Sequence, residues 1–180
     1  MLERLIVEHG SPTLAGLKVG SLIQVPLTDS FPRDFRRVSE TLRKKGLAIR
    51  VLRRISGKAS VYVYRPAKLR EVLGCPAVQA FLTTREYEDF DTEKAIRTLS
   101  RHMHREAFPH EVGIFLGYPL EDVKAFIHGG RACVACGCWK AYSNECEARR
   151  IFALYDKCTA VYTRLYASGS PLEKLTVAVS

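Results

Sequence analysis

The residues best suited to chemistry are cysteines that lie close together in the second half of the chain. Cys133 and Cys136 have the C-x-x-C spacing, in which a short loop lets two thiolates converge on one ion. Zinc would need two more ligands from Cys138, Cys146, Cys158 or His128, and an iron–sulfur cluster would need four thiolates. A reversible dithiol would need only the C-x-x-C pair. The sequence therefore predicts a metal or redox site, with incidental buried thiols as the alternative. The expected site residues are Cys133, Cys136, Cys138 and Cys146.

Histidines offer two candidates for acid–base or anion-binding chemistry. His110 stands beside Glu111 at an expected helix start, where a histidine and an acid could form a general acid–base pair. Neighbours on a helix diverge, however, so these two side chains need not cooperate. His9 precedes Ser11 and Thr13, and Ser11 followed by proline is typical of an N-cap with proline in the first helical turn. A helix N-terminus offers free N–H groups to an anion, although Ser11 could simply cap its helix.

Two further positions suit ligand binding. Trp139 and its neighbour Lys140 could line a pocket for a planar ligand, although aromatic residues in a short strand are more often part of the core. Arg65, at the end of an expected strand, could grip a phosphate or carboxylate group, or make an ordinary surface ion pair. The expected ligand-binding residues are Ser11, Thr13, Lys18, Arg65, Trp139 and Lys140.

Positive charge is concentrated in one part of the chain. The net charge is +9, and the segment from Arg33 to Arg70 contains thirteen lysines and arginines against two acids. Such a local excess predicts a surface for phosphate, nucleic acid or an acidic protein, or merely a solvated face. The expected basic surface consists of Arg36, Arg37, Arg43, Lys44, Lys45, Arg50, Arg53 and Arg54.

The elements that must position these groups indicate an α+β fold. An amphipathic helix is expected over 34–45, and two segments of high β-propensity, 47–55 and 60–64, flank Ser56-Gly57-Lys58 as a hairpin. If helix and hairpin packed side by side, their arginines would form one continuous positive surface. A strand is also expected at 22–25, and a helix that begins at Ser11.

The second half of the sequence is mostly helical. Pro66 and Pro76 each suit the first turn of a helix, Asp91 suits an N-cap, and Asn144 with Glu147 suits a capping box. Short helices are expected over 108–116 and 120–127, and strands over 138–142 and 172–180. We therefore expect a single domain, residues 1–180, with a small, mostly antiparallel sheet that includes the basic hairpin and is packed by several short helices.

Several functional classes lack their usual sequence marks. There is no G-x-S-x-G, no Walker-type loop and no G-x-G-x-x-G, which would indicate common hydrolase, P-loop and dinucleotide chemistries. The N-terminal segment lacks the order of a secretory signal, and no apolar run approaches the length of a bilayer. A cytoplasmic location without membrane association is therefore expected, with thiols kept reduced.

Several of these segments together resemble a bacterial family described only as domain of unknown function 3793. The matching segments are 9–18, 61–66, 108–119, 122–123, 126–127, 139–142 and 158–159, of which FPHEVGIFLGYP (108–119) is the most specific. The sequence departs from the family at Gly10, where the family tends to have a cysteine, and Cys136 and Cys138 look like features of this member. The resemblance implies a small cytoplasmic protein of anaerobic bacteria without an assigned activity, encoded near flavodoxin-type and iron-uptake genes.

Two functional hypotheses follow. The first is a metal- or redox-linked accessory protein, in which the segments of His9, His110 and the cysteines meet at one site that holds zinc or an iron–sulfur cluster. Its basic surface would dock an acidic partner such as a flavodoxin. The alternative is a nucleic-acid or nucleotide-binding module, in which the basic surface contacts phosphates and Tyr62 or Tyr64 stacks on bases. An enzyme that uses His110 or His9 as its acid–base group stays open.

Overall fold

A three-stranded antiparallel sheet forms the centre of the computed structural model, which describes residues 1–129 and 132–178. β1 (Gly20–Pro26) and β2 (Ala48–Ile55) both pair with β3 (Lys58–Tyr64), so the strand order is β1-β3-β2. β2 and β3 form the predicted hairpin. Ser56 and Gly57 have positive φ values of 48° and 71°, the conformation that a tight hairpin turn needs.

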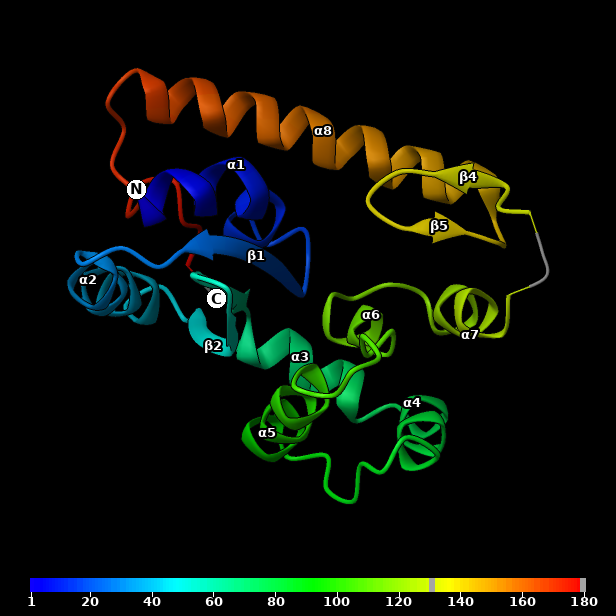
Figure 1. Ribbon diagram of the computed structural model, residues 1–180. Helices are drawn as coiled ribbons and strands as arrows, with labels where there is room; N and C mark the ends of the chain where they lie inside the picture. The colour runs from blue at the N-terminus through cyan, green and yellow to red at the C-terminus, as the bar shows by residue number, and fades with distance from the viewer. Residues whose placement is uncertain (130–131, 179–180) are drawn as a thin grey trace.

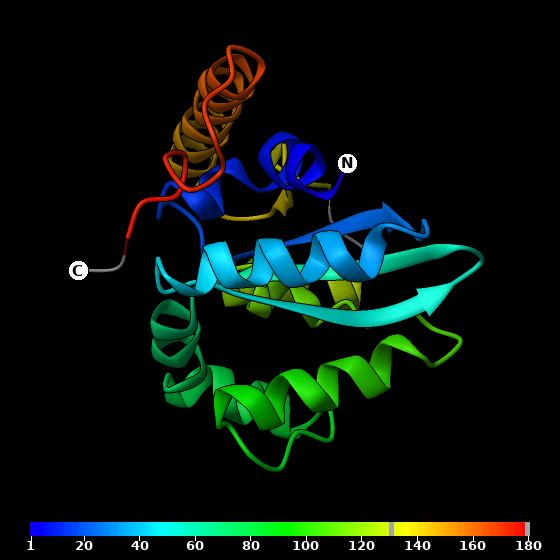
Figure 2. The same cartoon turned by 90° about the vertical axis from the view of Figure 1, so that its left-hand side faces the viewer.

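Helices cover both faces of this sheet (Figure 2). α1 (Leu2–Leu14) and α2 (Phe31–Arg43) pack against the face that carries Ile23, Ile49 and Val61. α3 (Pro66–Leu73) and α5 (Thr92–Met103) pack on the opposite side, with Leu52, Tyr62 and Tyr64. Because side chains alternate along a strand, the sheet separates two hydrophobic cores.

The remaining elements extend these two layers (Figure 1). α4 (Pro76–Thr83), α6 (Val112–Phe115) and α7 (Leu120–His128) belong to the core on the α5 side. A separate two-stranded hairpin, β4 (Ala135–Cys136) and β5 (Lys140–Ala141), precedes the long helix α8 (Glu145–Ala167), which lies along α1. Among the described residues, no helix is both long and apolar enough to cross a membrane.

The predicted α+β class, with a small antiparallel sheet, is confirmed. Pro66 and Pro76 do lie in the first turns of α3 and α4, and the Asp91 side chain accepts hydrogen bonds from the backbone N–H groups of Glu93 and Lys94. Asn144 likewise accepts one from the N–H of Glu147 at the start of α8. The short helix expected over 108–116 is limited to α6.

Two element predictions are wrong. The first helix begins at Leu2 and contains Ser11 and Pro12 near its end, because Leu2, Ile6 and Val7 already form a buried apolar stripe. Pro12 has no N–H to donate, so the last turn of α1 lacks one backbone hydrogen bond. The expected last strand is absent from residues 172–178, where Leu172 and Leu175 are buried on one side of a turn; residues 179–180 lie outside the described part.

Candidate ligand pocket

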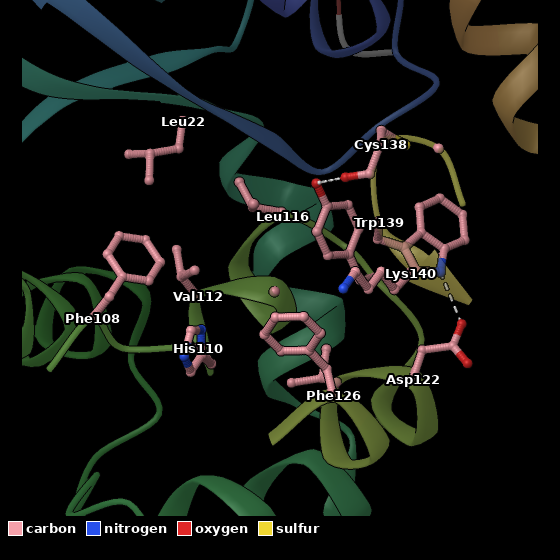
Figure 3. A pocket seen from close by; sticks show the side chains of 14 residues that line it. Leu22, Phe108, His110, Val112, Leu116, Asp122, Phe126, Cys138, Trp139 and Lys140 are labelled. Atoms are coloured by element: carbon pink, nitrogen blue, oxygen red, sulfur yellow. Dashed lines mark hydrogen bonds between the residues drawn. The ribbon is translucent and has the colours of Figure 1, made fainter. Parts of the chain in front are cut away.

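A cavity of 410 Å³ lies between β1, the segment from Phe108 to α7, and the β4–β5 hairpin (Figure 3). Most of its wall is apolar or aromatic. We call it the aromatic pocket, and its lining residues are Leu22, Phe108, His110, Val112, Gly113, Leu116, Tyr118, Asp122, Val123, Phe126, Gly137, Cys138, Trp139 and Lys140.

Two glycines allow the wall to close this tightly. A Cβ atom on Gly113 would lie 2.7 Å from Cγ2 of Val123 and 3.2 Å from Cδ2 of Tyr118, so only glycine lets α6 approach α7. Gly117 has a φ of +80°, and a Cβ atom there would lie 2.6 Å from Cγ2 of Val19. Gly113 within α6 and Gly117 in the turn after it therefore both have to be glycine.

Asp122 fixes the β4–β5 hairpin to α7. Its carboxylate is buried, with 2% of the residue exposed, and accepts hydrogen bonds from Trp139 Nε1 and the Tyr142 backbone N–H, both at 2.8 Å. The backbone N–H and hydroxyl of Ser143 donate to it as well, at 3.2 and 3.1 Å. A buried carboxylate needs such partners. Asp122 is therefore saturated by the protein and positions the pocket wall.

Trp139 is clamped by other aromatic rings. Its ring stacks on Tyr118 at 5.2 Å between centroids and meets Phe152 edge-on at 4.5 Å. The Tyr118 hydroxyl donates to the backbone carbonyl of Cys138 at 2.8 Å, and burial raises the pKa of this phenol. Both faces of the indole are thus engaged, and a ligand would meet the edge of this aromatic stack.

The polar side chains left for a ligand are His110 and Lys140. The His110 ring lies edge-on to Phe126 at 5.0 Å, and Lys140 Nζ lies 5.7 Å from the centre of the same ring. In Figure 3 the amino end of Lys140 points toward the middle of the pocket. The arrangement can therefore hold an apolar body together with a negatively charged group.

A second cavity, of 480 Å³, lies on the other side of Cys138 and is lined by His9 and Lys18. Lys18 Nζ is 5.1 Å from the Tyr118 ring centre, so this cation lies over an aromatic face. Burial lowers the pKa of Lys18, with Cys138 opposing, and burial raises the pKa of the Cys138 thiol, with Lys18 opposing. Cys138 therefore lies beside both the His110 segment and the His9 segment, but in two different cavities.

The predicted four-cysteine metal site is not assembled. Cys133 and Cys136 form a disulfide with each other, and Cys138 and Cys146 are free and exposed. Within residues 1–129 and 132–178, no three histidine, cysteine, aspartate or glutamate side chains converge as metal ligands would. Zinc or an iron–sulfur cluster needs four ligands around one point, and the described residues do not provide that geometry.

The comparison with known families identifies the chain. The family model described as protein of unknown function (DUF3793) matches residues 6–176. The chain belongs to this family. Searches of the curated proteins and of the solved structures give no significant match. The segments that carried the family resemblance in the sequence (108–119, 122–123, 126–127 and 139–142) supply most of the wall of the aromatic pocket. The residues that carried the resemblance in the sequence therefore lie mostly around this pocket.

Three expected ligand-binding residues of this family member are buried instead. Arg65 does not point outward: it is 2% exposed and donates to the carbonyls of Thr13, Leu14 and Val177 at 2.6–2.9 Å. Ser11 donates to the carbonyl of Val7, and the Thr13 and Ser21 hydroxyls hydrogen-bond at 2.9 Å. The expected anion site at a helix start is wrong because Ser11 lies inside α1.

His110 and Glu111 do not form a pair. His110 is exposed beside the aromatic pocket, whereas Glu111 is buried and its Oε1 lies 2.8 Å from Nδ1 of His102. His102 was not among the predicted site residues. Its position three residues after Leu99, on the apolar stripe of α5, was the signal that this histidine faces inward.

The basic residues do not form one continuous surface. Arg50 lies on the α5 side of the sheet, paired with Glu93 at 3.0 Å, whereas α2 packs on the other side. Arg37 pairs with Glu3 of α1 at 3.4 Å. Tyr62 and Tyr64 are fully buried and stack on each other at 4.8 Å, so they cannot stack on bases.

Proposed function

We propose that the chain binds a small planar molecule with an anionic group in the aromatic pocket. The composition of that pocket carries the proposal. Its walls are apolar and aromatic, and its one buried carboxylate, Asp122, is already saturated by protein donors. His110 and Lys140 are left to meet the ligand, and both suit a negative charge.

The contacts also define the shape of the ligand. Tyr118, Trp139 and Phe126 supply three aromatic rings to the pocket wall, and an aromatic or otherwise planar body would pack against the edges of these rings. Lys140 Nζ lies near the apolar wall, where a carboxylate, sulfonate or phosphate would interact with it more strongly than in bulk water. The proposal is thus a planar, mostly apolar anion.

A matched pair of dyes tests this proposal. 8-Anilinonaphthalene-1-sulfonate carries the anionic group, and N-phenyl-1-naphthylamine has the same aromatic body without it. We expect the sulfonate to bind about tenfold more tightly, because a charged hydrogen bond contributes roughly 1.5 kcal/mol or more. The dye fluorescence gives both dissociation constants, and quenching of Trp139, the single tryptophan, places the dye.

Lys140→Met should abolish the preference for the sulfonate while leaving the affinity for the uncharged dye nearly unchanged. The control is Lys157→Met, which removes an exposed lysine of α8 away from the pocket. Equal binding of both dyes, or an unchanged preference in Lys140→Met, would disprove an anion-selective pocket.

A redox role is the second candidate, and the disulfide between Cys133 and Cys136 favours it. The pair lies in the same hairpin as Trp139 and Lys140, because Cys136 is the register partner of Lys140. In a cytoplasmic protein, as expected here, such a disulfide is usually transient and catalytic or redox-sensing. A dithiol reductant would break the S–S bond to give two thiols and would itself become a disulfide.

Docking of an acidic partner is a separate part of the proposal, because α2 lies at the opposite end of the molecule from the β4–β5 hairpin that holds the disulfide (Figure 1). An acidic protein such as a flavodoxin would bind the exposed basic side chains of α2 and the turn after it, among them Arg36, Arg43 and Lys44. Electrostatic steering of this kind weakens with added salt. Binding that is insensitive to salt, or unaffected when these three residues are changed to glutamine, would exclude the α2 surface.

A further inference from the structure

A buried histidine lies outside the aromatic pocket. The His102 side chain on α5 is 5% exposed, and its Nδ1 lies 2.8 Å from Oε1 of Glu111, which is also buried. The Tyr87 hydroxyl donates to the same oxygen at 3.4 Å. Because an ionised carboxylate only accepts hydrogen bonds, Nδ1 must carry the proton. Glu111 therefore fixes the orientation of the imidazole.

The other nitrogen of His102 faces a cavity of 390 Å³, which is also lined by Arg85, Arg105 and His110. Nε2 lies 3.7 Å from Oε2 of Glu86, and the Arg105 guanidinium donates to that same oxygen. One carboxylate oxygen thus occupies the point where a buried histidine and an arginine converge. Since Nδ1 already carries one proton, Nε2 donates only when His102 is an imidazolium, and in that form the imidazolium and the guanidinium are a pair of donors typical of oxyanion recognition.

Glu86 reaches this point from an unfavourable backbone conformation. Its φ is +66°, and the backbone N–H groups of Glu86 and Tyr87 donate to the carbonyls of Thr83 and Leu82. This is the Schellman arrangement at the end of α4, and the left-handed position in it is ordinarily glycine. A glutamate in the left-handed region costs on the order of 1 kcal/mol or more.

Glycine would form the same turn with less strain, so the presence of a glutamate at this position needs an explanation. Its carboxylate is 67% exposed and so contributes little stability through its ion pair with Arg105. It lies over His102 and Arg105 and can swing into solvent without unpacking any core residue. Glu86 thus resembles a built-in ligand that an external anion could replace.

We infer that this cavity binds the oxyanion of a small molecule, a phosphate or carboxylate group, between Arg105 and the Nε2–H of protonated His102. The anion takes the place of the Glu86 carboxylate, which moves into solvent. The site is independent of the proposed function: the two cavities share Phe108 and His110 as wall residues, but Glu86, His102 and Arg105 do not line the aromatic pocket.

The test removes the negative charge of Glu86, which competes with an external anion for His102 and Arg105. Glu86→Gln keeps the shape of the side chain but not its charge, and we expect it to bind inorganic phosphate about tenfold more tightly than the parent protein, because the competent state is no longer occupied. Chemical shifts of the His102 imidazole and the arginine side chains, followed during titration at about pH 5.5, below the ordinary imidazole pKa of about 6.5, give the affinity. Acetate in a parallel titration distinguishes a carboxylate site from a phosphate site.

The decisive comparison changes one arginine that lines the cavity, Arg105, and one that does not, Arg97. Glu86→Gln combined with Arg105→Gln should lose phosphate affinity at least tenfold, whereas Glu86→Gln combined with Arg97→Gln should keep it, because Arg97 is exposed on α5 and does not line the cavity. The inference is overturned if Glu86→Gln binds neither anion more tightly than the parent. It is also overturned if both arginine changes weaken binding equally, which would indicate general attraction to a basic protein.

Discussion

At the scale of single residues, Arg65 is a buried cation whose guanidinium donates to backbone carbonyls. Its guanidinium joins three segments through the carbonyls of Thr13, Leu14 and Val177. Arg65→Met keeps the bulk but removes three hydrogen bonds from a charged donor, while the Thr13 and Leu14 carbonyls keep the backbone N–H groups of Gly16 and Val177. We expect it to lower the free energy of unfolding by about 3 kcal/mol, because hydrogen bonds from a charged group contribute on the order of 1.5 kcal/mol or more each and water offsets part of their loss. Urea unfolding measures the change.

The matched control is Arg70→Met, since Arg70 is exposed on the neighbouring helix α3 and should change stability by less than about 0.5 kcal/mol. Hydrogen exchange would also show earlier opening around Val177 in Arg65→Met alone. A loss below about 1 kcal/mol would mean that water replaces the guanidinium at these carbonyls.

At the scale of elements, the features that depend only on residues close together in the chain could be predicted from the sequence. The hairpin of β2 and β3, the prolines that begin α3 and α4, and the Asp91 cap all follow from local spacing and backbone chemistry. The role of Asp122 could not be predicted, because its donors come from residues 139–143. Nor could the separation of Arg50 from α2, because the layer in which each helix packs depends on tertiary contacts.

The β4–β5 hairpin is held from two sides, and this gives an element-scale prediction. The disulfide closes β4, whereas Asp122 holds the residues that follow β5. Reduction should therefore loosen β4 alone. We expect the Val134 amide, which donates to the Ala141 carbonyl at 2.8 Å, to exchange roughly 30-fold faster, since a short disulfide loop contributes about 2 kcal/mol.

The Tyr142 amide, bound to Asp122, should keep its protection after reduction. Cys133→Ser combined with Cys136→Ser should reproduce the reduced state, and Cys146→Ser, a change in α8, should not. If Val134 and Tyr142 lost protection together, the hairpin would open as one unit. If neither did, the disulfide would not hold β4.

At the scale of the whole molecule, the sheet separates two cores, and tyrosines are concentrated in the one on the α5 side. Tyr62, Tyr64 and Tyr87 are at most 1% exposed there. Burial raises the pKa of all three phenols, to about 12 for Tyr64, where Arg50 opposes the rise. The three phenols of this core therefore keep their protons to a higher pH than phenols in the unfolded chain.

The consequence is a loss of stability in alkali. In the unfolded chain, phenols lose their protons near pH 10, whereas the folded chain keeps them until about pH 12 or above. Between these values the unfolded state binds fewer protons, so the free energy of unfolding falls as the pH rises. These three phenols contribute a slope of up to about 4 kcal/mol per pH unit, and Tyr118 and Tyr155, whose pKa burial also raises, add to it. Burial lowers the pKa of Lys18, which opposes this trend, but it is a single group.

Urea unfolding at several pH values between about 8 and 11 measures this slope, and the part of the tyrosinate absorbance that is missing in Tyr62→Phe should appear only as the protein unfolds. Tyr62→Phe loses the hydrogen bond to the Phe115 carbonyl, so it should be less stable than the parent at neutral pH. It should nevertheless lose stability about one fifth more slowly above pH 10, because one of five phenols whose pKa is strongly raised by burial is gone. Equal slopes in the two proteins, or the Tyr62 part of the tyrosinate absorbance forming in the folded state near pH 10, would mean that water reaches this core, and the two-core arrangement would then not explain the alkaline behaviour.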